Sequence, residues 1–388
     1  MSTIVAKQTL IQQYAAQAIG QTFTAVSLHV HQQGQPPLTW AGGQVNPEAG
    51  PWPATNDTVF DLASLTKLFV TTALLRLLAS QNLSVDEKVA AFLPEFSGPR
   101  PLAPYEDPLH PGQMITIQKE GGPIDASTIT LRQVLSHSAG LPAWRPLYRM
   151  PADQRREAVL HTALAYFPGR RVVYSDIGFI LLGWVVEALS GQPLADALRT
   201  WVAEPLGLTS VHYRAAQPPP PAVQQGTAAT EVCPWRGRRI WGEVHDENAW
   251  SLRGVSGHAG LFATAADVAG LGKAWLEALQ GHPKHRSWAA LAREAVRLQA
   301  QEGDTRRGLG WALWSSAPTS ISRPLSPSSF GHTGFTGTSL YIDPPRGLVV
   351  AALTNRVYFG RAPEPICRWR QGFHALLAGL FPLPEGAA

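Results

Sequence analysis

Residues 59–70 read VFDLASLTKLFV and place a serine and a lysine three positions apart at the start of an apolar run. Asp61 can cap a helix that begins here, which puts Ser64 in its first turn and Lys67 on the same face. The run stays mostly apolar as far as Leu78, which predicts a buried helix. Burial lowers the pKa of an ammonium, so Lys67 could take the proton of Ser64. A serine at a helix start with a snorkelling lysine would give the same pattern by chance.

The composition is that of a globular chain with few charges. Of its 388 residues, 45% are hydrophobic and 15% are charged, and the 13 tryptophans argue against disorder. The net charge is +4 and the pI is near 9.2, but the positive charge is spread thinly. Nucleic-acid binding needs a concentrated basic stripe, so this class is disfavoured. Cys233 and Cys367 lie far apart and match no metal-binding pattern, so we expect neither a metal nor a cofactor.

The first 20 residues lack the continuous apolar segment of a signal peptide and predict an amphipathic helix. The apolar runs at 74–78 and 177–186 are too short or too interrupted to cross a bilayer. We therefore expect a cytoplasmic protein that does not contact membranes. No pattern in the sequence predicts an oligomeric state.

Strand patterns lie near both ends of the chain. Residues 23–31 alternate apolar and polar side chains and lead through a turn into 38–42, which predicts a hairpin. Residues 339–343 and 348–354 predict a second hairpin, and a closing helix is predicted over 364–379. Strands at both ends with helices between them indicate one antiparallel sheet with a helical region inserted in the middle.

Several helix starts are predicted within that middle region. Ser84–Glu87 and Thr130–Gln133 both fit the capping box, and Thr264–Asp267 is a related pattern. Gly140, followed by Pro142, is expected to close the helix that begins at Thr130.

The motif Tyr174-Ser175-Asp176 precedes a predicted helix over 178–189. A tyrosine here could serve as a second base if a lysine beside it lowers its pKa. Asp176 could cap the helix or bind Lys67. Taken by itself, the motif is explained as well by a packed tyrosine and a capping aspartate.

Residues 331–339 read GHTGFTGTS, and their glycines allow a ligand to approach the backbone closely. The hydroxyl groups and His332 supply hydrogen-bond donors, and a backbone amide here could bind an oxyanion. An ordinary turn would not need a histidine flanked by glycines.

In their order along the chain, the three motifs resemble those of the serine beta-lactamase and penicillin-binding-protein-like family, in its class C and esterase-like branch. The resemblance extends over about residues 15–375. Agreeing segments are FDLASLTK (60–67), LSVDEKV (83–89), TLRQVLSHSAGLP (130–142) and EPLGL (204–208). It implies an α+β fold of the beta-lactamase/transpeptidase type with three α/β/α layers. We expect a discontinuous sheet domain, residues 1–80 and 255–388, and a mainly helical insert, residues 81–254.

The resemblance also implies roles for individual residues. Ser64 is the expected nucleophile, and Lys67 and Tyr174 are expected to activate it and to protonate the leaving group. The oxyanion hole is expected from the backbone amides of Ser64 and Phe335. Residues assigned to substrate or oxyanion binding are Asp176, His332, Thr333, Gly334 and Phe335.

Two positions depart from the commoner family pattern. His332 stands where the family has a lysine, and histidine need not be charged near neutral pH. Asp176 stands where asparagine is commoner, and its charge should raise the pKa of Lys67 and leave Tyr174 as the working base. Both departures favour an ester or amide substrate other than a β-lactam.

The segments EVHDENA (243–249) and GVSGHAGLF (254–262) place histidines and acids close together in sequence. Metal ligation is conceivable, but the spacing matches no standard site. We expect His245, Asp246 and His258 to form a wall of the substrate cleft or to order a loop. The segment resembles one in family members linked to muropeptide turnover.

The sequence therefore predicts a serine hydrolase that forms an acyl-enzyme with an ester or amide. Its partner is expected to be a small-molecule or peptide substrate, and D-alanyl peptides and muropeptides are candidates. The alternatives are a beta-lactamase and a slowly acylating, penicillin-binding-like sensor. A purely structural relative is a third alternative.

Overall fold

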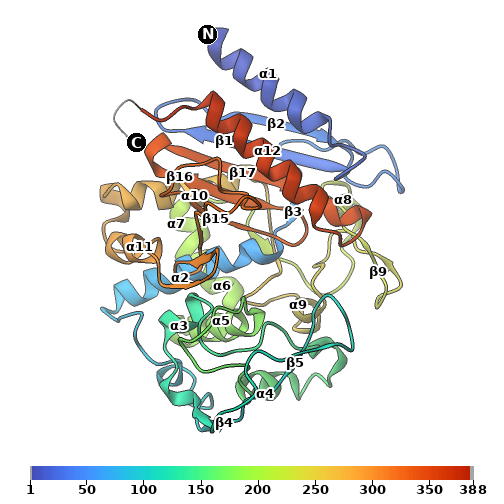
Figure 1. Cartoon of the computed structure of the whole chain (residues 1–388). Helices are drawn as coiled ribbons and strands as arrows, with labels where there is room; N and C mark the ends of the chain where they lie inside the picture. The colour runs from blue at the N-terminus through green and yellow to red at the C-terminus, as the bar shows by residue number, and fades with distance from the viewer. Residues whose placement is uncertain (1, 385–388) are drawn as a thin grey trace.

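A computed structural model describes residues 2–384. Its largest sheet joins the two ends of the chain, and each pair of neighbouring strands is antiparallel. In Figure 1 the blue N-terminal strands lie beside the red C-terminal ones. The strand order is β12 (Ala300–Glu302), β13 (Thr305–Arg307), β14 (Ala312–Leu313), β15 (Phe330–Thr333), β16 (Ser339–Asp343), β17 (Leu348–Thr354), β1 (Ala25–Gln32) and β2 (Leu38–Gly43).

Helices cover both faces of this sheet. Alternate residues of a strand point to opposite faces, so Val350 of β17 packs against the outer helices α1 (Ser2–Ala16) and α12 (Glu364–Leu380). Its neighbour Val349 packs in the inner core, where α10 (Ala265–Leu279) lies against the sheet. The three-layer α/β/α arrangement predicted from the resemblance is thus confirmed (Figure 1).

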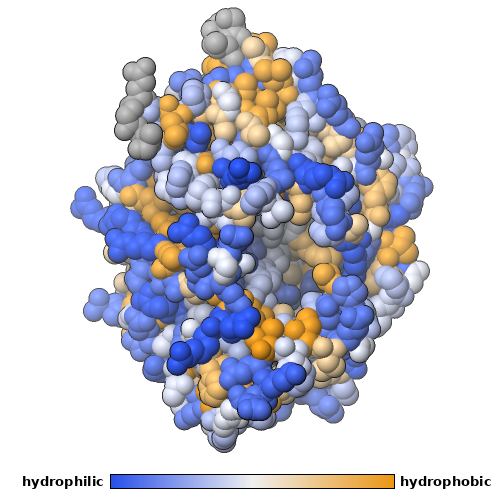
Figure 2. Space-filling view, in the orientation of Figure 1, coloured by the Kyte–Doolittle hydropathy of each residue, from blue (hydrophilic) through white to orange (hydrophobic). Residues whose placement is uncertain are grey.

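The outer layer leaves apolar side chains on the surface. Val5 and Leu10 of α1 are 65% and 45% exposed. Hydrophobic residues are visible at this end of the molecule in Figure 2.

Helix α2 (Thr66–Ser80) lies at the centre of the inner core. The window Ala63–Ser80 is long and apolar enough to cross a bilayer by composition alone, but 78% of it is buried inside the protein. It packs against α5 (Asp176–Ser190). The other helices are α3 (Leu131–Leu135), α4 (Arg155–Leu160), α6 (Leu194–Leu198), α7 (Glu204–Leu206), α8 (Pro221–Gln225), α9 (Glu247–Ser251) and α11 (Ala289–Ala295).

Short strands pair outside the large sheet. β11 (Leu261–Ala263) lies between β3 (Phe60–Asp61) and β8 (His212–Tyr213). Three further pairs are β4 (Pro99–Arg100) with β7 (Ile124–Asp125), β5 (Tyr105–Glu106) with β6 (Met114–Ile115), and β9 (Val232–Cys233) with β10 (Arg238–Arg239). Because β3 pairs with β11, the segment before Ser64 is held beside the residues that follow His258.

Most of the predicted elements are confirmed: both terminal hairpins, the closing helix, the helix after Tyr174 and two of the predicted caps. Thr130 forms a complete capping box with Gln133. Thr264 accepts a hydrogen bond from the Asp267 amide and caps α10.

The predicted helix start at Ser84–Glu87 is wrong. The hydroxyl of Ser84 accepts a hydrogen bond from the Asp86 amide, but the chain turns here and no helix begins. The carbonyl groups of Val85 and Glu87 instead accept from the amides of residues 132 and 131. Pairing with another segment thus replaces the helical hydrogen bonds.

The predicted end of the helix from Thr130 is also wrong. α3 ends at Leu135, and His137 follows in a left-handed conformation with φ of +59°. Gly140 instead lets two loops pass closely, because a Cβ there would lie 2.5 Å from the Tyr166 carbonyl oxygen.

The predicted domain boundaries stay a prediction. The inner core is one continuous cluster that includes side chains of the sheet, of α2 and of α5. Both cysteines are free thiols in the structure.

Candidate active site

Ser64 lies in a tight turn between β3 and α2. Asp61 accepts a hydrogen bond from the Ala63 amide through Oδ1 at 2.8 Å. Residues Ala63–Leu65 form one 3₁₀ turn, and α2 begins only at Thr66. The prediction that Asp61 caps the long helix, with Ser64 in its first turn, is therefore wrong. A 3₁₀ turn that contains Ser64 separates Asp61 from the start of that helix. Ala63 has a φ of +45°, a strained conformation directly before Ser64.

Lys67 is fully buried, and its ammonium group has three close polar neighbours. Nζ donates to Ser64 Oγ at 2.9 Å and to the His258 carbonyl at 3.0 Å, and it lies 2.7 Å from Asp176 Oδ1. Burial by itself would lower the pKa of Lys67, but the charges of Asp176 and of Tyr174 and their hydrogen bonds outweigh it and raise the pKa. Lys67 is therefore charged near neutral pH, as the aspartate in the motif predicted.

The charge on Lys67 decides which group can accept the serine proton. An ammonium that donates to Ser64 Oγ has no lone pair for that proton. Tyr174 lines the same cavity as Ser64, and Lys67 Nζ lies 4.9 Å from its ring centroid. The charge on Lys67 therefore disfavours Lys67 as the acceptor and leaves the Tyr174 oxygen as the candidate.

The start of α5 decides the role of Asp176. Ser175 Oγ accepts a hydrogen bond from the Gly178 amide at 3.1 Å, so Ser175 is the residue that caps the helix. The sequence left two roles open for Asp176, capping the helix or binding Lys67. In the structure Asp176 pairs with Lys67.

Two threonines join the H-T-G segment to the turn that holds Ser64. Thr336 Oγ1 donates to the Asp61 carbonyl at 2.7 Å, and Thr338 Oγ1 donates to the Leu62 carbonyl at 3.0 Å. The turn between β15 and β16 and the turn before α2 are therefore fixed to each other, although Thr336 and Asp61 are 275 positions apart in sequence.

Gly334 makes the close approach of these two segments possible. A Cβ at this position would lie 2.5 Å from the Leu62 carbonyl oxygen, so any larger residue would push the segments apart. Thr333, Gly334 and Phe335 line the cavity together with Ser64. The two amides predicted to bind an oxyanion thus come from the two segments that the threonines join.

His332 is buried beside Tyr174, with ring centroids 5.8 Å apart. Its Nδ1 lies 2.9 Å from the Thr333 carbonyl, which places the proton on Nδ1. Burial lowers the pKa of His332 well below its usual value, and the charges of Arg307 and Lys67 lower it further. His332 is therefore neutral, and its Nε2 is a buried acceptor without a partner among the described residues.

These side chains surround a cavity of about 370 Å³. The molecule is hollowed near the centre of the face seen in Figure 2. The cavity is lined by Ser64, Tyr174, Arg307, Ala312, Ile321, His332, Thr333, Gly334, Phe335, Tyr341, Arg356, Pro363, Ile366, Cys367 and Arg370. Three arginines and no acidic residue are among the described residues of this wall.

His245, Asp246 and His258 are not among the described residues that line the cavity. His258 bridges Ser256 Oγ at 2.8 Å and Asp246 Oδ1 at 2.9 Å. Burial raises the pKa of Asp246, but His258 and the hydrogen bonds outweigh burial and lower it. The predicted role of these residues as a cleft wall stays a prediction.

Asp176, Asp246 and His258 come close enough to hold a cation, with their ligand atoms within 4.8 Å of one another. The Lys67 ammonium already lies 2.7 Å from Asp176 and supplies positive charge to this cluster. We therefore interpret these three side chains as the polar environment of the Lys67 ammonium and not as a metal centre.

Sequence reasoning missed two residues that pack against Tyr174. Arg307 places its guanidinium 5.3 Å from the ring centroid, and the His137 ring centroid lies 4.5 Å away. His137 Nδ1 accepts a hydrogen bond from the Ser175 amide at 3.0 Å. Arg307 belongs to no motif and could not have been found by pattern. His137 lies within the segment TLRQVLSHSAGLP, where it could have been noticed.

Comparison with known proteins places this chain in a family. A model of the Beta-lactamase family matches residues 8–366, which is most of the chain. The chain belongs to the beta-lactamase family. It is 32% identical over 335 residues to an Escherichia coli K12 protein named "Putative D-alanyl-D-alanine carboxypeptidase", covering 79% of this chain and 71% of that protein. A Salmonella agona protein of the same name is 30% identical over 356 residues, covering 86% and 76%.

Solved structures share the fold of this beta-lactamase family member. EstCE1, described as a hydrolase with promiscuous acyltransferase activity, superposes with a TM-score of 0.68 at 22% identity, over 95% of this chain and all of EstCE1. An octameric penicillin-binding protein homologue from Pyrococcus abyssi also superposes with a TM-score of 0.68, at 19% identity, over 96% and 77%. The predicted fold and family are thus confirmed.

Replacing Asp176 with asparagine is expected to move the alkaline limb of the pH–rate profile to lower pH. The substitution removes the charge that raises the pKa of Lys67 and leaves burial, which lowers it. Lys67 then loses its proton at a lower pH, and the support it gives to the site is lost there. The measurement is kcat/KM against pH for a neutral ester. Coincident profiles for wild type and variant would contradict the assignment.

Proposed function

We propose that the protein hydrolyses an ester or amide through an acyl-enzyme on Ser64, and that its substrates carry a carboxylate close to the scissile bond. The observation that carries the proposal is the cationic wall of the cavity that holds Ser64. Because His332 is uncharged, a different cation must bind the substrate carboxylate in this chain. The arginines of the cavity wall supply that positive charge.

The reaction uses groups that line one cavity. The Tyr174 phenolate takes the proton of Ser64 as Oγ attacks the substrate carbonyl, while the Lys67 ammonium holds Oγ in place. The backbone amides of Ser64 and Phe335 bind the oxygen that becomes negative. Tyr174 then returns the proton to the leaving group, and a water molecule hydrolyses the ester on Ser64.

Arg307 is the arginine best placed to meet a substrate carboxylate. Its Nε is buried without a hydrogen-bond partner among the described residues, and no described acid pairs with it. The other two arginines are committed, because Arg356 donates to the carbonyl groups of Phe335 and Arg361, and Arg370 donates to the Thr338 carbonyl. A carboxylate would satisfy the guanidinium of Arg307 in a pocket that otherwise leaves it unpaired.

The names of the relatives support the same substrate class. A D-alanyl-D-alanine carboxypeptidase acts on peptides that end in a free carboxylate, and two relatives carry that name. A β-lactam with its ring carboxylate fits the same charge, so slow acylation by β-lactams is the second candidate.

A panel of matched substrates tests the proposal. Peptides that end in D-alanyl-D-alanine are compared as free acid and as C-terminal amide, together with a p-nitrophenyl ester and nitrocefin. We expect the free acid to exceed the amide in kcat/KM by at least about tenfold, as one charge-assisted contact allows. Equal values for acid and amide would exclude carboxylate recognition, and hydrolysis of nitrocefin alone would favour a beta-lactamase.

Replacing Arg307 with glutamine is expected to raise KM for the free acid by roughly 10- to 100-fold, which corresponds to about 1.5–3 kcal/mol for a hydrogen bond to a charged group. The value for the neutral ester should change little. The matched control is Arg306→Gln, because the Arg306 guanidinium donates to the Trp314 carbonyl and does not line the cavity. An equal loss with acid and ester would show that Arg307 supports the site rather than the carboxylate.

A further inference from the structure

The ring of Phe335 is held from several sides, although only its backbone amide is expected to meet the substrate. The His245 ring stacks on it with centroids 5.7 Å apart and planes 26° apart. The Arg356 guanidinium lies 4.5 Å from the ring centroid, and Arg356 Nε donates to the Phe335 carbonyl at 2.8 Å. The position of Phe335 is therefore fixed through its side chain and through its carbonyl group.

The backbone of His245 is linked through Asp61 to the turn that precedes Ser64. Its amide donates to Asp61 Oδ2 at 2.6 Å, and Asp61 Oδ1 accepts from the Ala63 amide at 2.8 Å. Ala63 has the strained φ of +45° that precedes Ser64. His245 thus contacts the Phe335 ring with its imidazole and holds the turn of Ser64 with its backbone.

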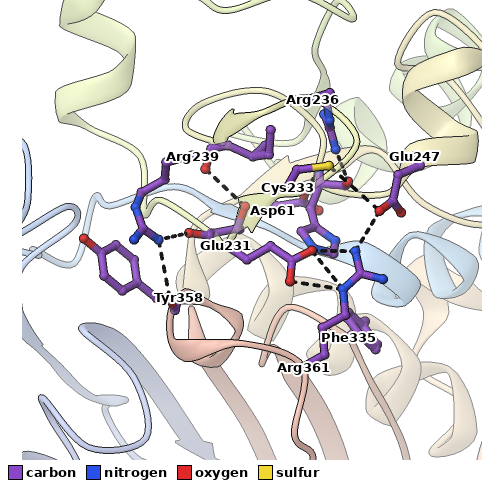
Figure 3. A network of polar contacts seen from close by, with 12 residues as sticks. Asp61, Glu231, Cys233, Arg236, Arg239, Glu247, Phe335, Tyr358 and Arg361 are labelled. Carbon is purple, nitrogen blue, oxygen red and sulfur yellow. Dashed lines mark hydrogen bonds and ion pairs between the residues drawn. The ribbon is translucent and has the colours of Figure 1, made fainter. Parts of the chain in front are cut away.

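A buried ion-pair network fixes the imidazole. His245 Nε2 lies 2.9 Å from Glu231 Oε1, and the two side chains are almost fully buried. Arg361 Nε donates to both oxygens of Glu231 at 2.9 and 3.1 Å, and Arg361 also donates to Glu247 at 2.7 Å. Figure 3 shows Arg361 between the two glutamates, beside Phe335.

Glu231 remains a carboxylate over the whole working range of pH. Burial raises its pKa, but hydrogen bonds and charge from His245 and Arg361 outweigh burial and lower the pKa to about 2. A permanent acceptor at this position keeps the proton on Nε2 of His245 and holds its ring in one orientation.

We propose that His245, held by Glu231, is a positioning residue that sets the spacing between the two amides of the oxyanion hole. The inference rests on the proposed acyl-enzyme function, since an oxyanion forms only in that reaction. Preorganised donors act on charge that develops in the transition state, so a displacement of either amide costs more there than in the ground state. Loss of the imidazole should therefore lower kcat and leave KM nearly unchanged.

The test compares His245→Phe, which keeps an aromatic ring on Phe335 but loses the contact with Glu231, with the wild type. We expect kcat for the p-nitrophenyl ester to fall 10- to 100-fold, and KM to stay within about threefold. Affinity for a boronic acid that forms a tetrahedral adduct with Ser64 should weaken by the same factor as kcat. Glu231→Gln should change both values in the same direction and serves if His245→Phe fails to fold.

The control is Glu247→Gln, which removes a partner of Arg361 without touching His245, and its kcat should stay within about twofold of wild type. A folded His245→Phe or Glu231→Gln protein with unchanged kcat and boronate affinity would overturn the inference and leave the proposed function intact. A parallel rise of KM would also overturn it, because the residue would then shape binding. A wild type whose Ser64 reacts with no ester or fluorophosphonate would refute the function and the inference together.

Discussion

Replacing Ser64 with alanine is expected to abolish turnover of esters and peptides, with kcat lowered by roughly 10⁴-fold or more. Ser64 Oγ is the hydroxyl that Lys67 holds at 2.9 Å inside the cavity, and alanine leaves no nucleophile at that place. The Lys67 ammonium remains paired with Asp176, so the fold should persist. Steady-state kinetics with the p-nitrophenyl ester measures the loss, and circular dichroism confirms folding.

The matched control for this substitution is Ser80→Ala, at the far end of α2, whose hydroxyl donates to the Leu77 carbonyl. Its kinetics should equal those of the wild type. One other strong nucleophile, Cys367, lines the cavity. Activity that survives in Ser64→Ala and vanishes in Cys367→Ser would show that the thiol is the nucleophile and would refute the assignment of Ser64.

Replacing Lys67 with methionine is expected to lower both activity and stability. Loss of the ammonium frees Ser64 Oγ and removes the charge beside Tyr174, so kcat should fall by roughly 10²- to 10⁴-fold. The same change leaves the Asp176 carboxylate without its cation, near Asp246, which should lower the free energy of unfolding by on the order of 3 kcal/mol. Urea denaturation and ester kinetics measure the two effects.

The double variant Lys67→Met/Asp176→Asn separates the two roles. It removes both members of the ion pair, so the free energy of unfolding should return most of the way to the wild-type value. Activity should stay at the level of the single variant, because the cation that holds Ser64 Oγ and lies beside Tyr174 is still missing. A double variant that recovers activity would contradict the role of Lys67 in catalysis.

Local patterns explain why much of the fold and the site could be predicted. The cap at Thr130 depends on residues three positions apart, and the alternation in 23–31 reflects a single strand meeting two environments. The spacing of Ser64 and Lys67 predicted their contact, although Ser64 lies in a 3₁₀ turn before the helix. Tyr174 and His332 were identified from the order of the motifs along the chain, because neither motif alone carries a physical signal of its role.

Contacts between distant segments explain what the sequence could not show. The helix predicted at Ser84 does not form, because the amides of residues 131 and 132 donate hydrogen bonds to the carbonyl groups of that turn. Arg307 comes to Tyr174 only because β13, β14 and β15 are neighbours in the sheet. The direction of the Lys67 pKa shift depends on two opposing effects, burial and the Asp176 carboxylate, which is more than 100 positions away in sequence.

The network around His245 could not be predicted for the same reason. His245 was noticed because it lies in a cluster of histidines and acids, which suggested a cleft wall. Its partners Glu231, Asp61 and Phe335 come from three separate segments, and Asp61 and Phe335 are far from it in sequence. The composition of a segment indicated that a residue matters, and only the fold showed what it touches.

The mass of the intact protein, quenched with acid during turnover of a slow depsipeptide, is the sharpest test of an acyl-enzyme on Ser64. We predict an adduct of the acyl mass that maps to the peptide containing Ser64, clears as substrate is exhausted, and is absent in Ser64→Ala. An adduct that persists would identify a sensor rather than a hydrolase. Turnover without any adduct, or an adduct on another residue, would contradict the proposed mechanism.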